Sequence, residues 1–376
     1  MMKVLQFKIV LLAMALLPMA LSAGGGKDGI YGMNGRYTKE KSIKKEFRVN
    51  PDALLKISNS YGNLTLASWN EDRVEIEVHI KTNGNNEERV KERLEEIHVD
   101  FQNSPSLVSA STDFGSRSSG WSWGLGGRSK VSVEVNYTIK LPVKNNINLS
   151  NDYGSIFLDR IDGHAKISCD YGKLQIGELR GRNNEISFDY TSRSTFGYIN
   201  SAEIVADYSG FTVEKAGDLK IRADYTNMTI QEMDHLDYSC DYGSLEAKRV
   251  GNVRGSGDYI GIKLGRVQGN VSISGDYGSL KIDQLAPDAG NVQINCDYTG
   301  IQIGYHPEYH FDFEISTEYA DVRGMEDFEV NISQVKSTER YYQGYHGAQN
   351  SGKKVHINSE YGGVGFNRNT SSINKQ

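Results

Sequence analysis

One pair of residues, aspartate followed by tyrosine, recurs along much of the chain at nearly constant spacing. Successive acids lie 17 to 21 residues apart. Self-similarity at a fixed period governs the architecture, because each repeat is one structural unit that stacks on the next. The acids are Asp152, Asp170, Asp189, Asp207, Asp224, Asp241, Asp258, Asp276 and Asp297, and the tyrosines are Tyr153, Tyr171, Tyr190, Tyr208, Tyr225, Tyr242, Tyr259, Tyr277 and Tyr298.

Apolar residues keep a fixed register around each acid. Ile167 stands three residues before Asp170, and Leu174 and Ile176 stand four and six after it. This alternation predicts strand, turn, strand with alternate residues inward. Two short strands cannot enclose a core alone, so neighbouring repeats must stack at about 4.8 Å. The sequence therefore predicts a mainly β chain folded as a single-stranded parallel β-solenoid. Frequent Asp-Tyr-Gly turns and uneven steps favour irregular right-handed coils of 17–21 residues over a left-handed hexapeptide helix.

The ends of the series set the predicted boundaries. Glu318 and Glu360 continue the acid positions, 42 residues apart, or twice 21. This gap predicts one degenerate coil carrying an insertion near 337–354. The solenoid is expected over 151–366 with a C-terminal tail at 367–376, and one outlying repeat copy, "NSYGNLTLASW", lies far upstream.

Residues 50–150 have a different pattern and are predicted to form an α+β cap that contains the outlying copy. The segments "RVEIEVHI" and "KVSVEVNYTIKL" alternate as half-buried strands do. Between them Val90, Leu94 and Ile97 share one helical face, with Asn85 or Asn86 as N-cap. A cap at the end of the solenoid covers a sheet edge that would otherwise invite aggregation.

The first residues indicate export. Residues 1–23 combine a basic start, a short apolar run and small residues, as a cleaved secretory signal does. The run is too short to span a bilayer comfortably. We expect a chain in the periplasm, on the cell surface or in the medium, with no transmembrane segment after cleavage and an N-terminal extension at 24–49. The formal net charge of −6 and the lack of basic runs give no indication of nucleic-acid binding.

Several stretches together resemble a known family. They are "NSYGNLTLASWNEDRVEIEVHIK", the acidic helix after it, and "YTIKLPVKNNINLSNDYGSIFLDRIDG", which leads into glycine-punctuated strands. The chain from about 45 to 365 is similar to the bacterial putative-adhesin family of β-strand-repeat secreted proteins of unknown function. That resemblance implies a β-solenoid and supplies no catalytic residues. The regular Asp-Tyr series departs from the less regular coils of the family.

The aspartate series requires an explanation because like charges 4.8 Å apart repel by about 0.9 kcal/mol per pair even in water. One hypothesis is local capping, in which each Asp accepts from the backbone N–H two residues on. The alternative is that carboxylates of successive coils share a divalent cation such as calcium. No other cofactor is expected.

The tyrosine series is interpreted as a stacked structural ladder at one corner. Identical residues in register on parallel coils lie one strand spacing apart and stack in offset fashion. In the alternation of each strand, the tyrosines fall at inward-facing positions. An exposed aromatic stripe that grips glycans is the alternative.

The three cysteines are predicted to be buried free thiols. Cys169, Cys240 and Cys296 take the same inward position, and the first two lie four coils apart, about 19 Å. A disulfide requires Cα atoms about 4.4 to 6.8 Å apart.

Residues 111–130 are predicted to form a loop rich in glycine and serine that carries Trp121 and Trp123. Exposed tryptophan indicates a contact, so these residues are candidates for binding a glycan or an envelope protein. The alternative is that the rings fold back over the cap.

These observations favour a non-catalytic exported protein that acts as an adhesin or as a structural or interaction protein of the envelope. The alternative from another class is a carbohydrate-active β-helix enzyme, a polysaccharide lyase or hydrolase, which needs two cooperating carboxylates. Asp159 with Asp162, or Asp283 with Asp288, are the candidate pairs. "HPEYH" at 306–310 is interpreted as a surface turn, because Pro307 opposes the helix that a zinc spacing requires.

Overall fold

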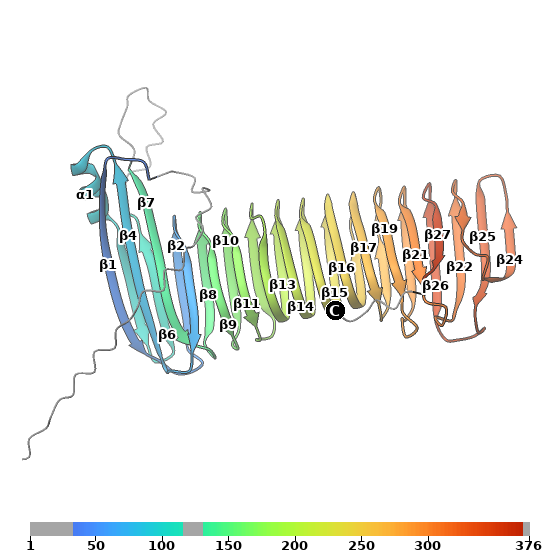
Figure 1. Ribbon diagram of the computed structural model, residues 1–376, viewed down its shortest axis with the longest axis horizontal. Helices are drawn as coiled ribbons and strands as arrows, with labels where there is room; N and C mark the ends of the chain where they lie inside the picture. Colours follow the sequence, from blue (N-terminus) through green and yellow to red (C-terminus); the bar gives the residue numbers. More distant parts are fainter. Residues whose placement is uncertain (1–32, 116–130, 371–376) are drawn as a thin grey trace, which may run out of the picture. The chain divides into compact units, whose positions relative to one another are not determined.

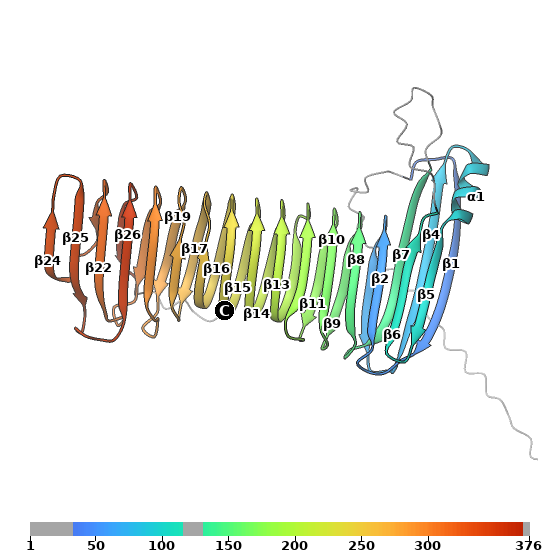
Figure 2. The ribbon, with the colours of Figure 1, turned by 180° about the vertical axis from the view of Figure 1, so that it is seen from behind.

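The computed structural model describes residues 33–115 and 131–370. The predicted signal at 1–23 and part of the predicted C-terminal tail lie outside the described residues. Within them the chain is mainly strand, with one helix, α1 (Glu87–Glu96), so the prediction of a mainly β protein is confirmed. Strands lie side by side in a long row (Figures 1 and 2). No helix among the described residues is long and apolar enough to cross a bilayer.

The strands have the following bounds. In the first half they are β1 (Tyr37–Arg48), β2 (Leu54–Ser60), β3 (Leu64–Trp69), β4 (Arg73–Gly84), β5 (His98–Ser104), β6 (Leu107–Asp113), β7 (Ser132–Pro142), β8 (Asn146–Asp152), β9 (Ile156–Ile161), β10 (Ala165–Asp170), β11 (Leu174–Leu179), β12 (Asn184–Asp189), β13 (Ser194–Asp207) and β14 (Gly210–Asp224). They continue as β15 (Asn227–Asp241), β16 (Gly243–Ser256), β17 (Ile260–Val267), β18 (Val271–Ser274), β19 (Ser279–Leu285), β20 (Val292–Asp297), β21 (Gly300–Tyr305), β22 (Phe311–Glu318), β23 (Val322–Arg323), β24 (Glu329–Val335), β25 (Glu339–His346), β26 (Lys354–Glu360) and β27 (Val364–Arg368).

Successive repeats pair in parallel with a register of one repeat. β8 pairs with β10 so that Asp152 lies beside Asp170, and β9 pairs with β11 so that Leu158 lies beside Ile176. The same register continues through β13, β14, β15 and β16, where Ile204 lies beside Ile221. The repeat read from the sequence is therefore the unit of strand pairing.

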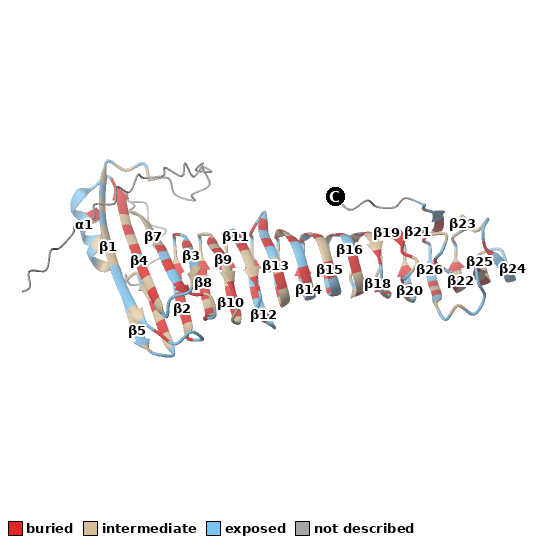
Figure 3. Ribbon diagram, turned by 60° about the horizontal axis from the view of Figure 1, so that its bottom comes forward, coloured by how far each residue is buried: buried red, intermediate tan, exposed pale blue. Residues whose placement is uncertain are grey.

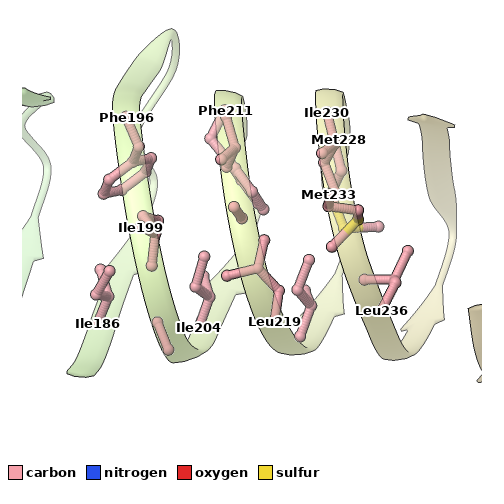
Figure 4. Packing of buried hydrophobic residues seen from close by; sticks show 14 of the residues in the cluster. Ile186, Phe196, Ile199, Ile204, Phe211, Leu219, Met228, Ile230, Met233 and Leu236 are labelled. Atoms are coloured by element: carbon pink, nitrogen blue, oxygen red, sulfur yellow. The ribbon is translucent and has the colours of Figure 1, made fainter. Parts of the chain in front are cut away.

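The core lies between the two halves of each repeat, which are separate strands in some repeats and one long strand in β13, β14, β15 and β16. Apolar residues alternate with polar ones along most strands of the repeats, so buried and exposed residues alternate in Figure 3. In Figure 4, Phe196, Phe211 and Met228 come from successive repeats and follow one another along one side of the core. The buried apolar residues form one continuous cluster that extends from Val49 to Phe366.

The N-terminal part adds an antiparallel sheet. β4 pairs antiparallel with β1 on one side and β7 on the other, while β2 and β3 pair in parallel with β8 and β9. The predicted helix is present, and the side chain of Asn86 accepts from the backbone N–H of Arg89 as its N-cap. The predicted extension at 24–49 includes a regular strand, because β1 pairs with β4 along its whole length.

The order of the last repeats differs from the prediction. β26 lies between β20 and β22 and pairs in parallel with both, so the repeat of Glu360 is inserted between those of Asp297 and Glu318 (Figures 1 and 2). The expected insertion at 337–354 is not a loop on a degenerate coil. Its first part is β25, which pairs antiparallel with β22 and β24. A spacing of 42 residues is consistent with either order, and the strand pairing decides between them.

Candidate functional site: the tyrosine ladder and the aspartate column

Tyrosine rings from successive repeats stack in one continuous row, which we call the tyrosine ladder. Neighbouring ring centroids lie 4.7–5.3 Å apart and ring planes differ by 2–8°. The spacing follows from the strand separation. In spatial order the ladder is Tyr61, Tyr153, Tyr171, Tyr190, Tyr208, Tyr225, Tyr242, Tyr259, Tyr277, Tyr298, Tyr361 and Tyr319.

Every tyrosine of the ladder has a left-handed backbone, with φ between +51° and +61°. This conformation is uncommon for a residue with a bulky side chain. It ends the strand at the tyrosine and turns the side chain away from the core, leaving it 42–53% exposed. The inward direction that alternation predicts for these side chains is wrong, because alternation holds only while the backbone stays extended.

The residue after each tyrosine completes the turn against the neighbouring repeat. At Gly154 a Cβ atom would lie 1.8 Å from the carbonyl oxygen of Gly62, and at Gly172 it would lie 2.0 Å from that of Gly154. Where the turn carries a hydroxyl instead, Thr226 donates to the carbonyl oxygen of Asp224. The Asp-Tyr-Gly and Asp-Tyr-Thr forms therefore serve the same backbone turn.

The acids form a parallel column beside the ladder, which we call the aspartate column. From Asp170 to Asp297, each carboxylate accepts a hydrogen bond from the backbone N–H of the acid in the next repeat, with N···Oδ1 distances of 2.8–3.3 Å. The tyrosine N–H of one repeat donates to the acid's carbonyl oxygen in the next, as Tyr225 does to Asp241 at 2.9 Å. The column begins at Asp152, in register with Asp170.

This arrangement corrects the capping hypothesis. The expected donor was the N–H two residues on in the same turn, whereas the observed donor belongs to the next repeat. The left-handed backbone at the tyrosine interrupts the parallel backbone hydrogen bonding between repeats. The carboxylate of the acid therefore supplies the acceptor at that position. A hydrogen bond to an ionised acceptor is the stronger kind, and it offsets the repulsion within the column.

The geometry limits what the ladder can bind. Inside the row both faces of each ring contact neighbouring rings, so the exposed parts are ring edges and hydroxyl groups. At one end the Phe114 ring meets Tyr61 edge-on, with centroids 5.6 Å apart. A sugar that stacks on an aromatic face finds no free face within the row. Desolvation and the neighbouring tyrosines raise the pKa of Tyr171 and Tyr242.

The outward faces of the strands carry ion pairs between repeats. Glu232 lies 2.7 Å from Lys215 and 2.5 Å from Arg249, one repeat to either side. Lys263 lies 2.9 Å from Glu246 in the same way. These partners are half-buried or solvent-exposed, so each pair contributes little to stability.

An open groove of about 1040 Å³ crosses the outward face of the early repeats. The Asp159 carboxylate accepts from the N–H of Ser68 at 2.9 Å, and Glu178 accepts from Arg180 at 2.7 Å. Asp162 binds Arg160 through both oxygens, and that arginine lowers the pKa of Asp162. The pair Asp159 and Asp162 is thus engaged in structural hydrogen bonds. The groove is lined by Asp159, Arg160, Gly177, Glu178, Arg180, Gly197, Tyr198 and Lys215.

Of the remaining candidates, Asp283 lies 3.0 Å from Lys281 and Asp288 is exposed, while the others are structural or fall outside the described residues. All three cysteines are buried and free, which confirms that prediction, and burial raises the pKa of each thiol to about 12. Residues 307–308 form a turn, as expected for "HPEYH". Within residues 33–115 and 131–370, no three His, Cys, Asp or Glu side chains come together as a metal site. Trp121 and Trp123 lie outside the described residues.

Sequence reasoning missed three members of the ladder. Tyr61 follows Ser60 in place of an acid, while Tyr319 and Tyr361 follow glutamates. The outlying copy at 59–69 and the glutamates of the series were the available signals. The groove had no sequence signal, because its residues come from four repeats that only the strand register aligns.

The chain was compared with protein families, curated proteins and solved structures. No family model and no curated protein matches the chain. Among solved structures, it is similar to a putative adhesin from Parabacteroides distasonis, with 10% identity, a TM-score of 0.30, and coverage of 89% of this chain and 98% of that one. It is also similar to a putative adhesin from Parabacteroides merdae, with 10% identity, a TM-score of 0.28 and coverage of 87% and 96%.

A putative cell adhesion protein from Clostridium sporogenes is similar at 11% identity and a TM-score of 0.18, with coverage of 88% of this chain and 100% of that one. These names match the family that the sequence resembles.

Proposed function

We propose that this chain is a non-catalytic, exported β-solenoid contact protein of the adhesin type, closed at its N-terminal end by the α+β region. Its contact surface is the tyrosine ladder, and its partner is a protein of the cell envelope. The proposals of export and of an envelope location rest on the sequence of residues 1–23.

The observation that carries this proposal is the exposure of the ladder. Twelve tyrosines, each 42–53% exposed, form one uninterrupted stripe. A large exposed aromatic patch marks an interaction surface, and tyrosine is enriched in protein interfaces. Stacking already restricts the rings, so binding immobilises few further rotamers.

The ring geometry favours a protein over a glycan. Protein interfaces use tyrosine through its edge and hydroxyl as well as through its face, whereas sugar stacking requires an open face. Only edges and hydroxyls are presented along the row. The repeated spacing also allows a partner to engage several rings at once, so that many weak contacts add.

The engagement of the acids supports a non-catalytic role. A general acid or nucleophile needs a carboxylate that reaches substrate. From Asp170 to Asp297 each acid holds an amide of the neighbouring repeat instead, and the acids of the groove are engaged as well. No observation on residues 33–115 and 131–370 favours the enzyme alternative.

The experiment is a pull-down from solubilised envelope with the full chain, quantified by mass spectrometry. In the test variant Tyr208, Tyr225 and Tyr242 are replaced by Asn, which tolerates a left-handed backbone. A matched control replaces the exposed outward residues Lys220, Asp237 and Arg254 by Asn. We expect the tyrosine variant to lose its protein partners while the control keeps them. Unchanged partners, or capture of polysaccharide by both variants, would reject the ladder as a protein-binding surface.

A further inference from the structure

The edge strand β24 has the properties of an unpaired association surface. Among the described residues β24 pairs only with β25. All seven of its residues are exposed, including Val330 at 41%, Ile332 at 41% and Val335 at 59%. Figure 1 shows β24 as the last strand of the row, at the end opposite to β1. An exposed apolar edge strand is a template for pairing with another strand.

The opposite end of the molecule is protected against such pairing. β1 carries Lys39, Lys41, Lys44 and Lys45 along an edge strand that pairs only with β4 among the described residues. Lysines on an edge strand prevent strand addition. β24 has no lysine and no proline, and its one charge is Glu329. The contrast indicates that association is suppressed at one end and permitted at the other.

We propose that β24 pairs antiparallel with β24 of a second copy of this chain, forming a twofold dimer joined at the C-terminal end. The pairing on β25 defines the two faces of the strand. One face of β24 carries Val330, Ser333 and Val335, and the other carries Glu329, Ile332 and Gln334. This assignment follows because the register shifts between residues 330 and 332, so that residues 331 and 332 together lie opposite one residue of β25.

The sequence of the strand is complementary to itself in this arrangement. A twofold axis at Ser333 places Val330 opposite Val335 of the second copy, on the same face of the sheet. It places Glu329 opposite Lys336, the residue that follows the strand. Each match occurs twice by symmetry, and no two like charges face each other. In the single chain Lys336 lies 2.6 Å from Glu339, so a dimer would share this lysine between two acids.

Disulfide trapping tests the register directly. Cα atoms of directly opposed residues lie about 4.5–5.5 Å apart in an antiparallel pair, within the range for a disulfide. The three native cysteines are buried and do not compete. Under mild oxidation we expect full chain with Ser333→Cys to form covalent dimers on a non-reducing gel. Ser272→Cys, exposed on β18, is the control and is expected to stay monomeric.

Charge exchange tests the same contact in solution. Sedimentation equilibrium of the full chain is expected to show a reversible dimer, weak because the interface is small. Glu329→Lys should raise the dissociation constant at least tenfold, and the double variant Glu329→Lys/Lys336→Glu should restore it. A monomer at every concentration, a dimer unaffected by both variants, or equal cross-linking of the two cysteine variants would overturn the proposal. Melting curves of each variant identify any that fail to fold.

Discussion

The backbone N–H of Asp258 donates to the carboxylate of Asp241 in the preceding repeat, with 2.8 Å between N and Oδ1. Next to it, the ring of Tyr259 stacks on that of Tyr242 with centroids 4.8 Å apart. The two residues of the repeated pair thus have separate tasks. The carboxylate of the acid accepts from a backbone N–H where the strand ends. The tyrosine turns the chain and exposes its ring.

The left-handed backbone at Tyr225 predicts an unusual order of substitutions. A β-branched side chain opposes this conformation, so Tyr225→Val should lose about 1–3 kcal/mol of unfolding free energy. Tyr225→Asn tolerates the conformation and should lose only the ring stacking, about 0.5–1.5 kcal/mol. Urea unfolding followed by circular dichroism measures both. Equal losses would show that the backbone of this residue is not strained.

Alkaline pH should destabilise the fold. Burial raises the pKa of Tyr137 and of the three thiols to about 12, above their values in the unfolded chain. The unfolded chain then loses protons first, so stability is full below about pH 8 and falls as pH rises towards 12. We expect a constant urea midpoint from about pH 7 to about pH 8 and a steady decrease above it. A midpoint that holds to pH 12 would contradict the burial of these groups.

The hydroxyl of Tyr238 is buried and has no hydrogen-bond partner in the described chain. Leaving such a group unpaired costs about 1–3 kcal/mol. Tyr238→Phe removes the hydroxyl and keeps the ring, so it should raise the melting temperature. The control is Tyr137→Phe, which loses a 2.7 Å hydrogen bond between the Tyr137 and Thr112 hydroxyls and should lower it. A decrease for both variants would indicate an ordered partner for Tyr238.

Calcium distinguishes the two explanations of the aspartate column. Carboxylates that hold backbone amides need no cation, so millimolar calcium should leave the melting temperature unchanged. Magnesium at equal ionic strength controls for screening of exposed charges. A rise specific to calcium would show that the acids of successive repeats share the ion.

Much of the fold could be predicted because the apolar register repeats. Ile167, Leu174 and Ile176 are buried as alternation requires, and the free thiols follow from the same register. The order of the repeats of Glu318 and Glu360 could not be predicted, since it depends on long-range strand pairing that spacing does not encode.

The site was harder to predict than the core. Alternation assumes an extended backbone, and it fails at Tyr225 because a positive φ reverses the direction of the side chain. The donor to each acid lies in another repeat, so a search within one turn could not find it. Trp121 and Trp123 remain predicted contact residues, outside the described part of the chain.

The most direct measurement compares two substitutions of the aspartate column at Asp207, Asp224 and Asp241. Asn keeps the Oδ1 acceptor and removes the charge, whereas Ala removes both. If the acids cap amides of the next repeat, the triple Asn variant should be as stable as the native chain or more stable in urea unfolding. The triple Ala variant should lose about 1 kcal/mol per site. Equal destabilisation by Asn and Ala would contradict the capping role and show that the charge itself is required.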